Sequence, residues 1–168
     1  MGDEEPLDHQ IRFVLEADRL KTVLRQTTNT DGSRQENTAE HSWHLALMAL
    51  ALAEHAPPGT DLGRVTAMVV LHDLVRLRGL WEEFEERRTP EARFARALDR
   101  LQPMLLNMQT GGGTWTAHGV SLDQVLAKVA LIEDGSASLG AYARQMIATA
   151  VARGFLAPDS AVGQKTAG

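Results

Sequence analysis

The chain has 168 residues, 43% of them hydrophobic, and carries a formal net charge of −5. This length and apolar content fit one compact domain with a sizeable core. Because the sequence contains no cysteine, disulfides, thiolate ligands and cysteine nucleophiles are excluded, and any metal must be bound by imidazole and carboxylate groups.

Hydropathy and charge also limit the location and the partners. No window holds the eighteen uninterrupted apolar residues of a membrane span, and the start Met1-Gly2-Asp3-Glu4-Glu5 is acidic where a signal peptide is basic. We therefore expect a cytoplasmic protein with no membrane partner. Basic residues are interleaved with acidic ones, so no nucleic-acid partner is expected, although a few local arginines can bind the phosphate of a small ligand.

Apolar residues follow helical spacing along nearly the whole chain, without convincing strand-type alternation, which predicts an all-α fold. A first helix is expected over about 7–25, and the polar stretch from Thr27 to Gln35 is expected to be a loop. The buried stripe of this helix would consist of Ile11, Val14, Leu15, Leu20 and Leu24.

A second helix is expected to begin at Asn37 or Thr38, either of which can cap free N–H groups, and to end at Pro57. It carries His41 in its first turns. His44 lies three positions later on the same face, where we expect it to support a ligand or to pack rather than to bind metal.

A third helix, capped by Thr60 or Asp61, places His72 on a buried face. The apolar residues of the same face are Val65, Met68 and Val69. The adjacent Asp73 therefore needs a compensating positive charge, because burying an unpaired carboxylate is costly. A bound cation would supply that charge.

The stretch from Glu82 to Arg88 is expected to be a solvent-facing helical surface. Thr89-Pro90-Glu91 is a good helix start with proline in the first turn. In that helix Asp99 lies beside residues expected to face the core, which are Phe94, Leu98, Leu101 and Leu105.

After a flexible loop at Gly111-Gly112-Gly113, two more helices are expected, over about 121–132 and 136–154. The last segment has more apolar residues than one helix face buries, which favours a helix-to-helix contact in a homodimer. These residues are Leu139, Tyr142, Met146, Ile147 and Phe155. We expect one domain over residues 1–156 and a disordered tail over 157–168.

Two imidazoles and two carboxylates on these helices could form a divalent-metal site: His41, His72, Asp73 and Asp99. Such a ligand set suits manganese, iron, cobalt, nickel or zinc better than calcium. Each residue alone has a more ordinary explanation, since a lone buried histidine is usually hydrogen-bonded and an aspartate usually lies at the surface or caps a helix. An all-α interaction module with purely structural histidines, which would bind no metal, therefore stays open.

The order and surroundings of these residues closely resemble the HD-domain phosphohydrolases, which are named for their His-Asp doublet. The segments that carry the resemblance are 34–42, His72-Asp73-Leu74 and Ala97-Leu98-Asp99, within a similarity that extends from about Leu20 through Leu156. The nearest branch looks like the bacterial 5′-deoxynucleotidases and their eukaryotic relatives. In the family, the positions that match His41, His72, Asp73 and Asp99 bind one divalent cation.

The resemblance implies that a water activated by one divalent ion (Mn, Co, Fe, Ni, Zn or Mg) hydrolyses a small phosphomonoester. A (deoxy)nucleoside 5′-monophosphate is the first candidate substrate. The resemblance also implies a basic residue that binds the substrate phosphate, for which Arg25 matches best by position and Arg34 is a second candidate. Gln26 stands where that branch can have an aromatic residue that discriminates against ribose, so selectivity for deoxyribose is not implied.

The sequence departs from the family pattern after the His-Asp doublet. Family members commonly have a Glu within a few residues and a Gly-Asp soon after, with roles in proton transfer and substrate binding. Here Arg76 follows Val75 directly, as though a loop and a helix were missing. Glu82 and Glu83 belong to the charged stretch and are not expected to replace these acids.

Two explanations of this junction are open. Either residues of the natural chain are missing from the sequence at this point, or the deletion is real. The first is favoured because the junction places basic residues where a buried helix face should continue. A real deletion would favour a catalytically weakened protein that binds metal or nucleotide as a regulator.

Overall fold

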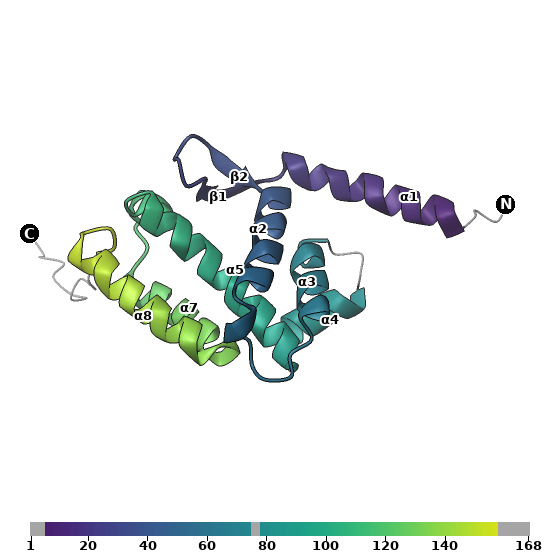
Figure 1. Cartoon of the computed structure of the whole chain (residues 1–168). Helices are drawn as coiled ribbons and strands as arrows, with labels where there is room; N and C mark the ends of the chain where they lie inside the picture. Colours follow the sequence, from purple (N-terminus) through teal and green to yellow (C-terminus); the bar gives the residue numbers. More distant parts are fainter. Residues whose placement is uncertain (1–5, 75–77, 158–168) are drawn as a thin grey trace, which may run out of the picture.

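The fold, seen in a computed structural model that describes residues 6–74 and 78–157, is built almost entirely of helices (Figure 1). In chain order the described elements are α1 (Pro6–Ala17), a 3₁₀ turn (Asp18–Thr22), β1 (Leu24–Thr28), β2 (Gln35–Asn37), α2 (Thr38–Ala51), a second 3₁₀ turn (Ala53–His55), α3 (Leu62–Leu71), α4 (Arg78–Glu86), α5 (Pro90–Gln109), α6 (Gly113–Ala117), α7 (Leu122–Gly135) and α8 (Ala137–Ala152). The predicted all-α class is confirmed, since the sheet of the described chain is a single two-stranded hairpin.

Helix α5 is the central element. It contacts α7 and α8 on one side and α2, α3 and α4 on the other (Figure 1). The side chains of Phe94, Leu98 and Leu101 are at most 2% exposed, as their spacing predicted. Asp99 lies on the same helix and is also buried, so one carboxylate is carried into the interior by the helix that organises the core.

Helix starts follow the local capping signals. The Asn37 side chain accepts a hydrogen bond from the backbone N–H of Glu40, and the Glu40 side chain accepts one from the backbone N–H of Asn37. Asp61 and Thr89 cap α3 and α5 in the predicted way. Each cap satisfies a backbone N–H group that has no partner inside its helix, which explains why these starts are predictable.

The predicted first helix is wrong beyond Ala17. Leu24–Thr28 is a strand that pairs antiparallel with Gln35–Asn37, so the expected loop is confined to the turn between the strands. The Gly32 N–H bonds to the Asn29 carbonyl in this turn, where Gly32 adopts a left-handed conformation with φ of 70°. Backbone pairing with the next strand of the hairpin outweighed helical spacing in β1.

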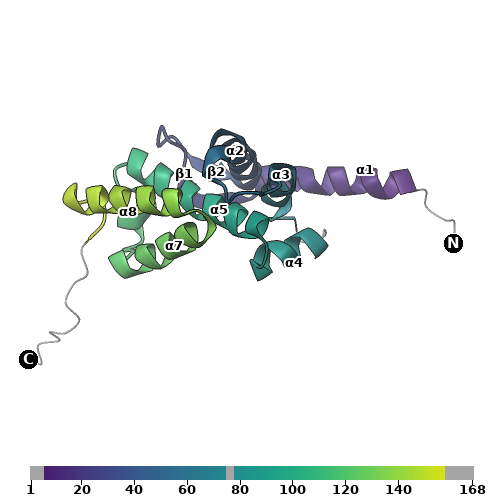
Figure 2. The same ribbon diagram turned by 60° about the horizontal axis from the view of Figure 1, so that its bottom comes forward.

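The predicted buried stripe of the first helix is also wrong. In both views α1 projects from the rest of the chain, and its main contact is with the 3₁₀ turn that follows it (Figures 1 and 2). Exposed fractions are 51% for Ile11, 63% for Val14, 65% for Leu15 and 62% for Leu24. The helical spacing is real, but no packed surface of the described chain faces it.

Three other expectations need correction. Helix α2 ends at Ala51 and a 3₁₀ turn follows before Pro57. The charged stretch 82–88 is not uniformly solvent-facing, because Phe84 is 1% exposed and packs in the core. The junction of Val75 and Arg76 lies outside the described residues, as does the predicted tail beyond Ala157.

Most of the apolar excess in the last helix is explained within the chain. Leu139, Met146 and Ile147 are buried in the core, Phe155 packs against it, and Tyr142 is exposed. The reason for expecting a dimer contact through these residues is therefore wrong, and the homodimer stays a prediction. No helix of the described residues has the length and apolar character needed to cross a membrane.

A close approach of α5 and α7 at Gly135 gives a stability prediction. A Cβ atom at Gly135 would lie 2.3 Å from the Arg93 carbonyl oxygen and 2.8 Å from the Ala97 Cβ. Gly135→Ala should therefore lower the free energy of unfolding by about 1–3 kcal/mol, despite the better helix propensity of alanine. Urea denaturation of the variant and the parent measures the change.

The matched control is Gly63→Ala in α3, where the nearest atom is Oδ1 of the capping residue Asp61, 3.2 Å away. This variant should change the free energy of unfolding by less than about 1 kcal/mol, because the better helix propensity of alanine offsets a small shift of the cap. Equal effects of the two substitutions would contradict the close approach of α5 and α7.

Candidate metal centre

The four predicted ligands converge at one place although they come from three helices. His41 lies in α2, His72 and Asp73 at the end of α3, and Asp99 in α5. Asp99 Oδ1 lies 3.2 Å from Nε2 of His41 and 3.7 Å from Nε2 of His72. His41, His72 and Asp73 each offer a donor atom within 4.8 Å of the others, a spacing that one cation can bridge.

Hydrogen bonds orient both imidazoles toward the carboxylates. Gln102 donates its amide N–H to the carboxylate of Glu36 (2.9 Å), so its amide oxygen faces Nδ1 of His41 at 3.2 Å. Nδ1 of His72 lies 2.8 Å from the Val69 carbonyl oxygen, which can only accept. Both rings therefore carry a proton on Nδ1 and present the Nε2 lone pair to the cluster.

The surroundings favour an added positive charge. Burial would raise the pKa of Asp99, but the hydrogen bond with His41 and the charge of Arg100 outweigh it and lower that pKa to about 2. Burial would lower the pKa of His41, but Asp99 and Glu36 outweigh it and raise that pKa. An ionised carboxylate therefore faces a nitrogen that needs a proton or a metal ion.

The donor set fits a divalent cation. Two imidazole nitrogens face two carboxylates, and Nε2 of His72 lies 3.3 Å from Oδ2 of Asp73. At such distances an imidazole lone pair and a carboxylate oxygen repel unless a proton or a metal ion lies between them. Imidazole with carboxylate suits first-row transition metals, so His41, His72, Asp73 and Asp99 would hold the ion, whose identity this geometry does not select.

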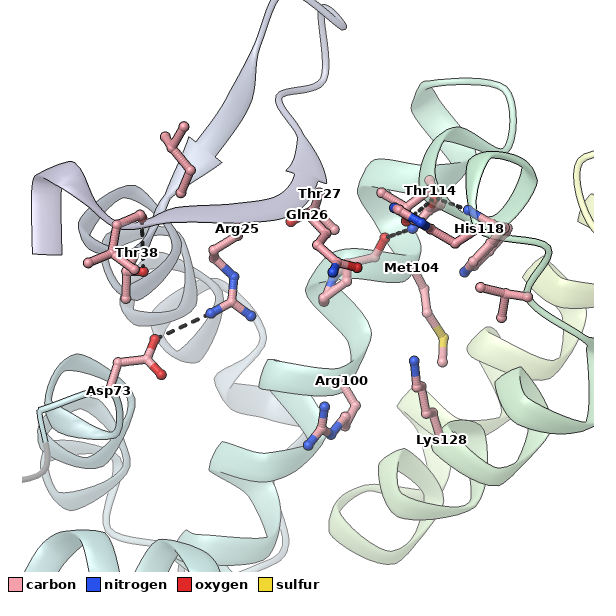
Figure 3. Close-up of a pocket in the computed structure, with 16 residues that line it drawn as sticks. Arg25, Gln26, Thr27, Thr38, Asp73, Arg100, Met104, Thr114, His118 and Lys128 are labelled. Carbon is pink, nitrogen blue, oxygen red and sulfur yellow. Dashed lines mark hydrogen bonds and ion pairs between the residues drawn. The ribbon is translucent and has the colours of Figure 1, made fainter.

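The two predicted phosphate ligands lie in different places. Arg25, on β1, reaches the metal cluster, with Nη1 at 3.3 Å from Oδ2 of Asp73 and Nε at 3.6 Å from Oε1 of Glu36 (Figure 3). Arg34 lies at the end of the hairpin turn, where its exposed guanidinium pairs with Glu40. The structure thus brings Arg25, and not Arg34, to the candidate centre.

His44 is connected to the cluster through Gln102, whose amide nitrogen lies 3.3 Å from Nδ1 of His44. Burial lowers the pKa of His44, so the neutral ring can accept this hydrogen bond. Gln102 therefore joins Glu36, His41 and His44 in one network, which agrees with the expectation that His44 supports a ligand.

Sequence reasoning missed several residues around the centre. Gln102 and Arg96 lie three positions after and before Asp99 on α5, so helical spacing could have indicated both. Nη1 of Arg96 lies 3.5 Å from Oδ2 of Asp99. Glu36 was visible in the motif before His41, but only the pairing of β1 with β2 shows that it faces the site.

Two pockets meet at the cluster. The smaller pocket has a volume of about 320 Å³, and its lining includes the predicted ligands other than His41. The lining residues are Arg25, His72, Asp73, Phe84, Glu85, Arg96, Asp99 and Arg100. Glu85 is its remaining carboxylate, 3.7 Å from Nη1 of Arg96. Glu83, by contrast, pairs with Arg64 and accepts a hydrogen bond from Thr89, so it does not take the place of the missing acids.

The larger pocket, of about 550 Å³, shares Arg25, Asp73 and Arg100 with the smaller one and extends between β1, α5 and α7 (Figure 3). Its volume lies within the range of small-ligand sites. A ligand in it would have one end at the metal cluster and the other near Lys128.

A helical domain with such a cluster is a candidate metal-binding domain, and comparison with known proteins identifies its family. The family model described as HD domain matches residues 17–76 and 75–139, and the chain belongs to this family. The two matched parts meet at residues 75–76, where the sequence departs from the family pattern.

A solved structure resembles the chain closely along most of its length. It is a predicted metal-dependent phosphohydrolase from Magnetospirillum magnetotacticum MS-1, determined by crystallography at 1.37 Å resolution. The two share 45% identity with a TM-score of 0.88, over 90% of this chain and 96% of that one. No curated protein matched the chain. The 5′-deoxynucleotidase branch stays a prediction.

The role of Gln102 gives a prediction for metal affinity. Gln102→Leu keeps the side-chain size but removes the acceptor that fixes the His41 proton on Nδ1. Affinity for Mn²⁺ or Co²⁺ should fall by about 10–100-fold, measured by isothermal titration calorimetry on metal-stripped protein. Gln109→Leu, on an exposed residue two turns along α5, is the control, and an equal loss in both variants would refute the role of Gln102.

Proposed function

We propose that this protein is a metal-dependent phosphohydrolase that releases phosphate from a small phosphomonoester. The observation that carries the proposal is the position of Arg25. Its guanidinium lies 3.3 Å from Asp73, at the edge of a cation site with four candidate ligands. Membership of the HD-domain family and the similar structure described as a predicted metal-dependent phosphohydrolase support it. A (deoxy)nucleoside 5′-monophosphate is the first candidate substrate.

Different residues of the chain have different roles in the proposed hydrolysis. When bound, a divalent ion makes water more acidic and neutralises charge on the phosphoryl oxygens. Arg25 binds the phosphate, and the carboxylates of Asp73 and Glu36 fix the direction of its planar guanidinium. In the reaction a P–O bond forms to the water oxygen while the ester P–O bond breaks, and the water proton ends on the leaving oxygen.

Glu85 is the group we propose to accept the water proton and to pass it on to the leaving oxygen. It lines the same pocket as His72, Asp73 and Asp99, and its ion pair with Arg96 positions it there. The acids that family members carry after the His-Asp doublet are absent from the sequence. A carboxylate from α4 would take over proton transfer without belonging to that motif.

The test is phosphate release from a panel of phosphomonoesters by protein loaded with Mn²⁺, Co²⁺, Ni²⁺ or Zn²⁺. Activity should disappear on chelation with EDTA and return with the added metal. Arg25→Ala should lower kcat/KM by about 100-fold, because it removes a donor to charge that develops on the phosphoryl group. Arg34→Ala should change kcat/KM less than about twofold, as expected for an exposed ion pair.

Phosphate release that persists after chelation, or equal losses of kcat/KM in the two arginine variants, would contradict the proposed function. Metal and nucleotide binding without any phosphate release would instead favour the regulator hypothesis. The regulator hypothesis rests on the sequence after Asp73, where the acids of the family pattern are absent.

The role of Glu85 is tested by Glu85→Gln, which removes the proton acceptor and keeps the shape of the side chain. We expect kcat to fall by about 100-fold or more, with metal affinity nearly unchanged. Steady-state phosphate release and calorimetric metal titration measure the two quantities. Glu86→Gln, on the exposed neighbouring residue, serves as the control, and a full kcat in Glu85→Gln would exclude Glu85.

A further inference from the structure

We infer that the larger pocket binds a second phosphate group of the substrate, beyond the one at the metal centre and toward Lys128. This inference rests on the proposed function and specifies its substrate class as phosphomonoesters that carry a second phosphate, such as nucleoside 3′,5′-bisphosphates. The residues we assign to the second phosphate are Arg100 and Lys128.

The pocket connects the metal centre to Lys128. Arg25, Asp73 and Arg100 line both the smaller and the larger pocket, so one ligand can occupy both. Figure 3 shows Arg25 and Asp73 on one side of the larger pocket, Lys128 on the other, and Arg100 between them. A substrate with its scissile phosphate beside Arg25 therefore extends toward Lys128.

The lining of the larger pocket carries an excess of positive charge. Arg25, Arg100 and Lys128 contribute three cations, whereas Asp73 is the single carboxylate among the described residues that line it. Asp73 is also a proposed metal ligand and the partner of Arg25. Within the lining of this pocket, the charge of Lys128 is therefore left to be balanced by a ligand, and that of Arg100 is shared with Asp99 of the neighbouring pocket.

Lys128 lacks the usual carboxylate partner of an exposed lysine on a helix. Such lysines commonly pair with an acid three or four positions away. On α7 the residues at these positions are Gln124, Val125, Leu131 and Ile132. No acid thus lies at these four positions beside Lys128, which lines the pocket.

The proposed metal ligands balance the charge of Arg100 only in part. Its Nε lies 3.6 Å from Oδ2 of Asp99, is buried, and makes no hydrogen bond within the described chain. Asp99 also lies near Arg96 and the two histidines, so its charge is shared. The Arg100 guanidinium can therefore bind an additional anion.

The chemistry of the two cations favours phosphate over a carboxylate. A phosphomonoester group carries a charge of about −1.5 to −2 at neutral pH and three acceptor oxygens, so it can accept hydrogen bonds from Arg100 and Lys128 together. A carboxylate has less charge and fewer acceptor oxygens for two cations. Met104 and Val120 also line the pocket, and their apolar surfaces suit a nucleoside or another uncharged spacer between two phosphates.

The test compares a 5′-monophosphate with the 3′,5′-bisphosphate of the same deoxynucleoside, using the Mn²⁺-loaded full chain. The KM for the bisphosphate should be about tenfold lower, because two charge-assisted contacts are added away from the reacting atoms. Lys128→Met should remove most of this difference and change kcat less than about twofold. Chromatography of the products identifies which phosphate is released.

Lys21→Met is the matched control, since Lys21 pairs with Asp18 on the surface and lies outside both pockets. It should leave both KM values unchanged. Equal KM values for the two substrates, or an equal effect of Lys128→Met on both, would overturn the inference while the proposed function stands.

Absence of phosphate release from every substrate would instead refute the proposed function. Calorimetric binding then tests the second phosphate separately, with the same two compounds and the metal-loaded protein. Tighter binding of the bisphosphate that Lys128→Met abolishes would support the inference, and equal affinities would overturn it.

Discussion

The structure depends on one electrostatic constraint, which is that imidazole nitrogens face carboxylates inside the domain and repel them unless a proton or a metal ion lies between them. Nε2 of His41 lies 3.2 Å from Asp99, and Nε2 of His72 lies 3.3 Å from Asp73. The other ring nitrogens are occupied by Gln102 and by the Val69 carbonyl. A cation between the four groups converts this repulsion into attraction, and it would also fix α2, α3 and α5 relative to one another.

The hairpin connects this centre to the arginine that we propose binds phosphate. Its strands carry Arg25 and Glu36, and Glu36 accepts hydrogen bonds from Thr27 (2.6 Å) and Gln102. Burial would raise the pKa of Glu36, but hydrogen bonds from His41 and Thr27 outweigh it and lower that pKa. An ionised Glu36 thus contacts both the network of candidate metal ligands and the guanidinium of Arg25, so the proposed cation site and the proposed phosphate site would be coupled through it.

Helices outside the His-Asp motif complete the surroundings of the centre. The family pattern is interrupted at residues 75–76, and α4 supplies Glu85 to the pocket beside the ligands. Helices α5 and α7 supply Arg100 and Lys128 to the larger pocket. In the proposed function the HD-domain scaffold would hold the ion, while these surrounding side chains would determine which phosphoester fits.

The sequence by itself determined the helix starts, the fold class and the four candidate ligands. Caps such as Asn37 and Thr89 act on N–H groups within three residues, and the buried face with His72 repeats along a single helix, so both are local properties. Tertiary structure alone decided the rest. Leu15 has the spacing of a buried residue but no surface of the described chain faces it, Arg25 and not Arg34 reaches the cluster, and Glu85 and Lys128 line pockets formed with distant helices. These outcomes depend on which segments far apart in the chain pack together, and short-range periodicity does not encode that information.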